Sequence, residues 1–216
     1  LAKRLPTILP PLCLQEALET TRIYSATGKL PRALSLMATR PVRQPHHSIS
    51  TAALVGAMNP CPCGYYGDPF RQCTCPPGLV SRYQRRISGP FLDRVDIFVE
   101  VPHIAYEKLT DTRLGEPSGK VQARVSATRS RQRQRFQKTR LACNAEMTPA
   151  EIREFCRVET AAQGLLQAAM KQHYLSARAF HRILKLALTI ADLEASDTIK
   201  AHHVAEAIQY RPRRSE

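Results

Sequence analysis

Four of the seven cysteines stand in two close pairs, Cys61-Pro-Cys63 and Cys73-Thr-Cys75, with nine residues between the pairs. Four thiolates can close a tetrahedral zinc site, and the two glycines of the intervening GYYGDPFRQ favour the turn that this site needs. A C-x-C spacing is tighter than the usual zinc-binding spacing, so four reduced cysteines on a loop and an iron–sulfur cluster stay open as alternatives. Because four cysteines leave no position for water, zinc here would be structural and would stabilise an irregular loop.

Asn59 precedes this loop at the end of an apolar run of small residues. A side-chain amide donates and accepts hydrogen bonds at once, which suits the positioning of a reactive water molecule. Asn59 also stands directly before Pro60, and an asparagine at that place is a strong turn former. The residues alone therefore leave a water-positioning role and a simple turn as alternatives.

Arg94 follows the loop in the segment Asp93-Arg94-Val95-Asp96. A guanidinium group is always charged and can bind two phosphate oxygens at once. The flanking carboxylates also allow an ion pair within the chain. A phosphate contact and an intrachain ion pair with Asp93 or Asp96 are therefore both predicted as possible roles.

The spacing of apolar residues predicts mostly helices around these residues. The strongest stripe runs through residues 176–193 and consists of Phe180, Ile183, Leu184, Ala187, Ile190 and Ala191. Thr148, Pro149 and Glu151 form a typical helix start. Further helices are predicted over 16–23, from Pro77, from Ser118, over 159–173 and over 202–210, and a strand is predicted over Ile97–Val101.

The charge of the chain points to a polyanionic partner. Lys and Arg number 32 against 18 Asp and Glu, a net charge of +14, so nucleic acid is expected as the partner ahead of an anionic membrane. A solvated basic surface that helps solubility is the alternative. No acidic residue lies between Glu116 and Glu146, and arginines stand at alternate positions in this stretch: Arg129, Arg131, Arg133 and Arg135. On a helix this spacing spreads them around the axis, which favours phosphate contacts over base reading. A solvated interdomain connector is the alternative.

Membrane insertion and secretion are not expected from the sequence. No run of about 18 apolar residues occurs. The start, LAKRLPTILPPLCL, lacks a small-residue cleavage pattern, so it is not read as a signal peptide. Together with cysteines that look reduced, this predicts a cytoplasmic location.

Seven ordered segments resemble the ComM/YifB group of AAA+ ATPases, also called magnesium-chelatase-like proteins. They are AKRLPTILPPL, EALETTRIYSATG, RPVRQPHHSISTAALVG, AMNPCPCGYYGD, RRISGPFLDRVDIFVEVP, LSARAFHRILKLALTIADL and HHVAEAIQYR. The resemblance implies an α/β AAA+ core over residues 1–117, which includes the cysteine loop. It implies a basic helix and an α-helical lid over residues 118–216.

The resemblance also implies roles for single residues. Asn59 matches the sensor 1 position, which helps to position the attacking water, and Arg94 matches the arginine finger that reaches the nucleotide of the neighbouring subunit. Arg178, in Leu175-Ser-Ala-Arg, matches sensor 2, which contacts the γ-phosphate. Arg182, one turn later, is an alternative phosphate contact. For Arg178 and Arg182 the other reading is a plain surface arginine.

The implied function is ATP-dependent DNA branch migration by a homo-oligomeric ring, expected to be a hexamer, with ATP and Mg²⁺ as cofactors. A magnesium-chelatase-type motor that remodels a protein complex is the alternative within the family. The 216 residues contain neither the P-loop nor the acidic Walker B strand of the family, and Gly56 runs directly into Ala57 where relatives carry further residues. Enzymatic activity of the chain in this form is therefore left open. A non-catalytic zinc- and nucleic-acid-binding remnant is the third reading.

Overall fold

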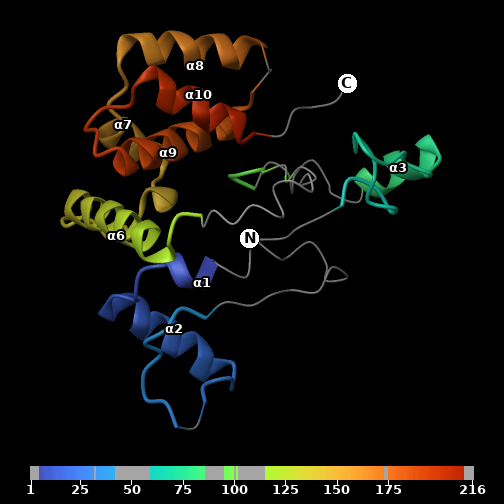
Figure 1. Cartoon of the computed structure of the whole chain (residues 1–216). Coiled ribbons are helices and arrows are strands. Elements are labelled where there is room, and N and C mark those ends of the chain that lie inside the picture. The colour runs from blue at the N-terminus through green and yellow to red at the C-terminus, as the bar shows by residue number, and fades with distance from the viewer. Residues whose placement is uncertain are drawn as a thin grey trace. The chain divides into compact units, whose positions relative to one another are not determined.

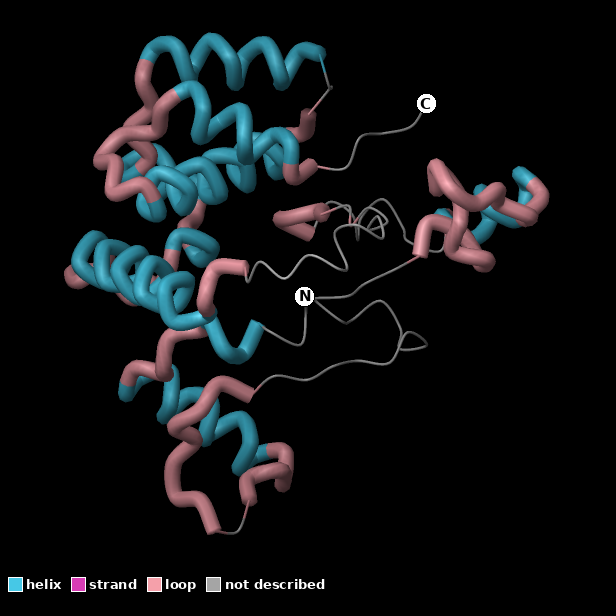
Figure 2. Tube along the Cα trace, viewed as in Figure 1, coloured by secondary structure: helices cyan, strands magenta, loops and turns pink. Residues whose placement is uncertain are grey.

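The computed structural model describes residues 5–31, 33–41, 59–85, 95–99, 101, 115–172 and 175–211. These residues form helices and loops, with no strand among them (Figures 1 and 2). The chain divides into two compact units, one of residues 1–44 with 114–131 and one of residues 45–113 with 132–216.

The strand predicted over Ile97–Val101 is not formed in its described residues, 97–99 and 101. In this segment the backbone N–H of Phe98 donates to the carbonyl oxygen of Tyr210 at 2.8 Å. A single bond to a carbonyl at the end of a helix is not the repeated ladder that defines a strand. The α/β core implied by the resemblance therefore has no counterpart among the described residues.

The first unit contains α1 (Leu5–Ile8), α2 (Leu14–Ala26) and the first part of α6 (Ser118–Arg135). Glu16 of α2 connects its own helix to Arg40 and to α6. Its carboxylate accepts from the backbone N–H of Cys13 at 3.0 Å, from Arg40 at 2.6 Å and from Arg129 at 2.8 Å. Burial raises the pKa of Glu16, but the Cys13 hydrogen bond and the two arginines outweigh it and hold this pKa below its usual value.

The second unit contains a helical bundle made of η2 (Asn144–Glu146), α7 (Pro149–Phe155), α8 (Thr160–Gln172), α9 (Ala177–Leu193) and α10 (Ala201–Gln209). The predicted apolar stripe of α9 faces the core of the bundle, and α7, α8 and α10 also contribute residues to this core. The buried cluster consists of Phe136, Met147, Ile152, Ala162, Leu166, Ile183, Leu184, Ala187, Leu188, Ile190, Ile199, Val204 and Ala207. The four helices predicted in this region are confirmed with shifts of one or two residues at their ends.

Local capping explains where these helices begin. Thr148 and Glu151 form the predicted capping box of α7, with the backbone N–H of Thr148 donating to Glu151 at 2.6 Å. The Ser176 hydroxyl accepts from the backbone N–H of Ala179 at 3.2 Å and so begins α9. An isolated parallel bridge between Val158 and Ile199 ties the loops that precede α8 and α10.

Ser176→Ala is expected to lower the unfolding free energy by about 1 kcal/mol, because the N–H group of Ala179 loses its acceptor. Ser176→Asn keeps a side-chain acceptor and serves as the control. Chemical unfolding followed by circular dichroism measures both variants. Equal losses in the two variants would contradict the capping role.

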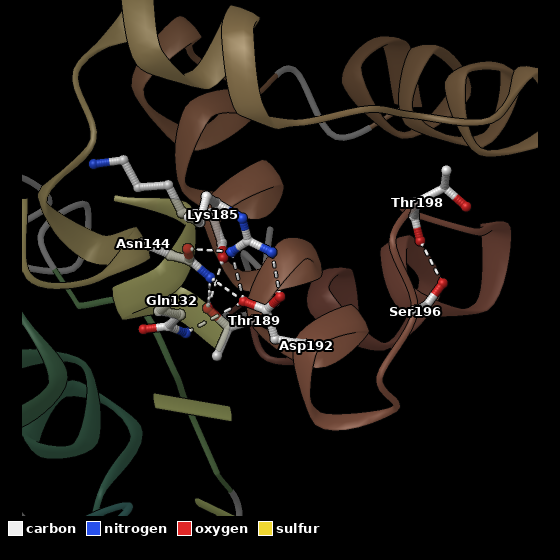
Figure 3. Close-up of polar contacts among 8 residues, drawn as sticks. Gln132, Asn144, Lys185, Thr189, Asp192, Ser196 and Thr198 are labelled. Atoms are coloured by element: carbon white, nitrogen blue, oxygen red, sulfur yellow. Dashed lines mark hydrogen bonds and ion pairs between the residues drawn. The ribbon is translucent and has the colours of Figure 1, made fainter. Parts of the chain in front are cut away.

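A buried polar network fixes the end of α9 to α6 and η2 (Figure 3). The Asp192 side chain is fully buried, and its carboxylate binds both terminal nitrogens of Arg135, with Nη1 at 2.8 Å from Oδ2. Asn144 donates to the same Oδ2 at 2.8 Å, and Gln132 donates to it at 3.4 Å. Asn144 also accepts from Arg135 at 2.9 Å and donates to Thr189 at 3.1 Å, so both ends of its amide are used. The network leaves the buried charge with a full set of partners.

Candidate functional sites

The cysteine loop and α3 (Pro77–Gln84) lie together in residues 59–85. The Gln84 side chain donates to the carbonyl oxygen of Pro60 at 3.2 Å, which ties the end of α3 to the start of the loop. Asp68 accepts from the backbone N–H groups of Phe70 and Arg71 at 2.8 and 3.0 Å and so shapes the tip. The helix predicted from Pro77 is confirmed, and Pro77 occupies its first turn.

Gly64 and Gly67 are required by the turn between the cysteine pairs. Their φ angles are +86° and +80°, a region in which residues with a Cβ are strained. The Gly64 N–H donates to the carbonyl oxygen of Cys61 at 3.0 Å, so the chain reverses directly after the first pair. This reversal is what allows the second pair to face the first.

The four sulfur atoms meet in one cluster, and Cys61 is fully buried. The Sγ atom of Cys61 lies 3.3 Å from that of Cys63 and 3.7 Å from that of Cys73, and Cys63 and Cys73 are 3.5 Å apart. A zinc ion with Zn–S bonds of about 2.3 Å in a tetrahedron separates its sulfurs by about 3.8 Å. The cluster is therefore close to the size of a four-thiolate zinc site, and all seven cysteines of the chain are free of disulfides.

The pKa values of the clustered thiols also favour binding of a cation. The backbone N–H of Tyr65 and the Cys61 side chain stabilise a thiolate at Cys63 and lower its pKa to about 6. The backbone N–H of Cys75 lowers the pKa of Cys73, but burial and the neighbouring thiols outweigh it and raise that pKa to about 12. The thiols of Cys63, Cys73 and Cys75 thus compete for protons, because close negative charges repel one another. A divalent ion at their centre would remove this competition and bind all four as thiolates.

Asn59 is exposed at the start of the cysteine loop. Its amide lies 3.7 Å from the position that a Cβ on Gly64 would occupy, so it sits beside the first turn of the loop. The apolar run before it, residues 51–58, lies outside the described residues, as does the junction of Gly56 and Ala57. The sensor 1 role of Asn59 stays a prediction.

Arg178 and Arg182 occupy the first two turns of α9 and differ in their surroundings. Arg178 is exposed and makes no ion pair among the described residues, so it can take an anionic ligand. Arg182 is mostly buried, with 21% of its side chain exposed, and its Nη1 lies 3.1 Å from Oδ1 of Asp96. Arg94, the predicted arginine finger, lies outside the described residues.

The four arginines predicted to contact DNA lie on α6 and are not equivalent. Arg129 pairs with Glu16, and Arg135 pairs with the buried Asp192. Arg131 is half-buried and Arg133 is exposed. The predicted helix is confirmed, but two of its arginines hold the fold together, a role that the even spacing did not indicate.

Glu194, His202 and His203 form a second group of close ligand atoms. Oε2 of Glu194 lies 2.9 Å from Nε2 of each histidine, and these hydrogen bonds lower the pKa of Glu194 to about 2. The backbone N–H of Lys200 donates to Nδ1 of the fully buried His203 at 2.9 Å. Nδ1 therefore accepts, Nε2 carries the proton, and Nε2 has no lone pair left for a metal. The group is a hydrogen-bonded start of α10 rather than a metal site.

Comparison with known proteins places the whole chain in one group. Residues 1–57 and 52–109 match the family model for magnesium chelatase, subunit ChlI, and residues 115–211 match the model for the C-terminal part of the same subunit. YifB of Escherichia coli is 33% identical over 98% of the chain and 53% of its own length. Competence protein ComM of Haemophilus influenzae is 40% identical over 73% of the chain and 30% of its own length.

The chain spans about half the length of the YifB relatives that it matches. The alignment with the Escherichia coli protein runs over 274 residues, more than the 216 of this chain, so that relative has residues without a counterpart here. The two matched pieces of the ChlI model meet near Gly56 and Ala57. These matches, together with the helical bundle and the cysteine loop, show that the chain belongs to the ComM/YifB family of magnesium-chelatase-like AAA+ proteins.

Proposed function

We propose that this chain is part of an ATP-dependent AAA+ motor of the ComM type that acts on DNA. The observation that carries the proposal is the 40% identity to competence protein ComM over 73% of the chain. The proposal includes an α/β core, a homo-oligomeric ring that we take to be a hexamer, and work in the cytoplasm. No helix in the described part of the chain is long and apolar enough to cross a membrane.

ATP with Mg²⁺ is the proposed cofactor, and three residues are proposed to serve its hydrolysis. Arg178 stands exposed in the first turn of α9, where the Ser176 cap fixes the helix start, and would bind the terminal phosphate. Asn59 would orient water, since its amide can donate and accept together. Arg94 would stabilise the charge that develops on the nucleotide of the neighbouring subunit.

Zinc is the proposed structural metal of the cysteine loop. The sulfur separations of 3.3 to 3.7 Å, the buried Cys61 and the low pKa of Cys63 support this ion. A four-cysteine site is closed to water, so zinc would fold the loop and take no part in the chemistry. The loop begins two residues after Asn59, and a fixed loop would hold that amide in place.

DNA contact by α6 is proposed for the arginines that remain accessible. Arg129 is paired with Glu16, and Arg135 is paired with Asp192. If these arginines turned to DNA, both ion pairs within the chain would be broken. Arg133 is exposed, as are Lys138 and Arg140 beyond the end of the helix. These residues are the better candidates for the phosphate backbone, with binding that weakens as salt rises.

Two other functions compete with this proposal. The family model takes its description from magnesium chelatase, which favours a motor that remodels a protein complex. A non-catalytic zinc- and nucleic-acid-binding protein is the other candidate, and the cysteine cluster and the net charge of +14 are the observations that favour it. A measurement of ATP hydrolysis with and without DNA separates the DNA motor from the other two candidate functions, because DNA is expected to stimulate hydrolysis only by a DNA motor.

Arg94→Ala is expected to lower ATP turnover by about a thousandfold or more and to leave ATP affinity unchanged, because an arginine finger acts on the transition state. Arg85→Ala, at another arginine in the same region, is the control and should keep its turnover. Steady-state hydrolysis and nucleotide titration measure the two effects. Unchanged turnover in Arg94→Ala would refute the finger.

A further inference from the structure

The tip of the cysteine loop, residues 65–71, exposes two large aromatic side chains beside α3 (Figure 1). Tyr66 is 52% exposed and Phe70 is 70% exposed. Aromatic rings contribute most of their free energy when a partner covers them. Two exposed rings only four residues apart therefore indicate a surface that a ligand or partner covers.

The backbone of the tip holds these rings in fixed places. The N–H of Asp68 donates to the carbonyl oxygen of Tyr65 at 3.1 Å, and Gly67 has a φ angle of +80°, so residues 65–68 form a tight turn with Tyr66 at its first corner. The Asp68 carboxylate accepts from the two backbone N–H groups of residues 70 and 71 and fixes the next bend. The clustered sulfur atoms hold both ends of the loop together.

Arg71 adds a positive charge to the same tip. Its guanidinium carbon lies 4.2 Å from the centre of the Tyr65 ring, and its Nη1 donates to the Tyr65 hydroxyl at 2.8 Å. This stacking keeps the planar cation at the exposed surface. Asp68 is the one carboxylate in the sequence of residues 59–85, and backbone N–H groups already engage it. Rings beside an arginine suit a partner that combines flat apolar faces with negative charge.

We propose that the tip of the cysteine loop binds single-stranded DNA, with bases stacked on Tyr66 and Phe70 and with Arg71 against the phosphate backbone. Unpaired bases offer the flat faces and phosphates offer the charge, whereas the bases of a duplex are stacked on one another. The two rings lie at most about 14 Å apart along the chain, within the reach of one short oligonucleotide. The inference rests on the proposed DNA function and names a surface of this chain that prefers single strands.

Tyr66→Ala combined with Phe70→Ala tests the proposal in the full-length protein that contains this chain. Fluorescence anisotropy measures the Kd for a labelled 20-nucleotide oligothymidine and for a 20-base-pair duplex. The double variant is expected to bind the single strand about thirtyfold or more weakly and the duplex within about twofold of the wild type, because two stacking contacts are lost. The salt dependence of the remaining binding should be unchanged. Arg71→Ala should instead reduce its log–log slope by about 0.7, the value of one phosphate contact.

Two further pairs of substitutions separate stacking from apolar contact. Tyr66→Trp with Phe70→Trp keeps the flat rings and should bind the single strand within about threefold of the wild type. Tyr66→Leu with Phe70→Leu keeps apolar side chains without rings and should bind as weakly as the double alanine variant. Leu193→Ala, at a 48% exposed apolar side chain at the end of α9, is the surface control and should leave both Kd values unchanged.

The outcomes separate the inference from the proposed function. A wild-type protein that binds neither probe would refute DNA as the partner, and the inference with it. Single-strand binding that persists in the double alanine variant would overturn the role of the tip and leave the DNA function intact. An equal loss on both probes, or a leucine pair that binds as well as the wild type, would overturn base stacking.

Discussion

Asp192→Ala is expected to lower the unfolding free energy of the helical bundle by about 3–5 kcal/mol, because it leaves the mostly buried Arg135 without a compensating negative charge. Only 16% of the Arg135 side chain is exposed, so water cannot replace the lost carboxylate fully. Asn144 and Gln132 lose an acceptor at the same time. For a bundle of this size, the loss corresponds to a fall in Tm of more than about 10 °C.

The matched control for this change is Glu154→Ala, which removes an exposed carboxylate from α7. Its effect should stay within about 0.5 kcal/mol, as for most surface substitutions. Urea unfolding followed by circular dichroism gives both values. An Asp192→Ala variant that loses less than about 1 kcal/mol would contradict the structural role of the network.

Cys61→Ser together with Cys73→Ser is expected to remove zinc from the protein and to unfold the loop of residues 61–75. Two of four ligands are lost, and a structural zinc ion supplies much of the folding free energy of a small irregular segment. Wild-type protein should contain one zinc ion per chain by elemental analysis. Limited proteolysis should cut the variant within this loop, while helices α7 to α10 remain resistant.

Cys143→Ser is the control for the metal, since Cys143 lies outside the sulfur cluster and is not bonded to another cysteine. It should keep its full zinc content. Purified wild-type protein that contains iron or no metal at all would contradict the zinc assignment. Zinc that persists at the wild-type level in the double serine variant would place the ion elsewhere.

The sequence predicted the helices of the bundle well, because they depend on local patterns. The apolar stripe of α9 repeats at helical spacing over its length, and Ser176 stands at its start as a cap. Thr148, Pro149 and Glu151 gave the start of α7 in the same way. The cysteine cluster was also predictable, because the spacing of the pairs and two glycines with positive φ fix the turn locally.

Contacts between distant residues could not be predicted from local patterns. Asp192 lies one helical turn after Leu188, on the buried face of α9. A carboxylate at such a position indicates that a charged or hydrogen-bonding partner lies beside it. Nothing in the spacing identified that partner as Arg135, 57 residues earlier. The same holds for the pairs of Arg129 with Glu16 and of Arg182 with Asp96.

The strand predicted over 97–101 shows that β-strand propensity alone does not predict a paired strand. Its β-branched residues favour an extended chain, but a strand also needs a neighbour along its whole length. The described residues offer Phe98 one backbone partner, at Tyr210, and Ile97, Val99 and Val101 remain exposed. Strand propensity alone could therefore not supply the pairing that a strand needs.

The most direct test of the proposed function is ATP hydrolysis, with and without DNA, by the full-length protein that contains this chain. A ComM-type motor predicts ATP binding and a hydrolysis rate that rises several-fold when single-stranded or branched DNA is added. The stimulation should weaken as salt is raised, because phosphate contacts release counterions. A full-length protein containing this chain that neither binds nor hydrolyses ATP, or that hydrolyses it at one rate with and without DNA, would contradict the proposal.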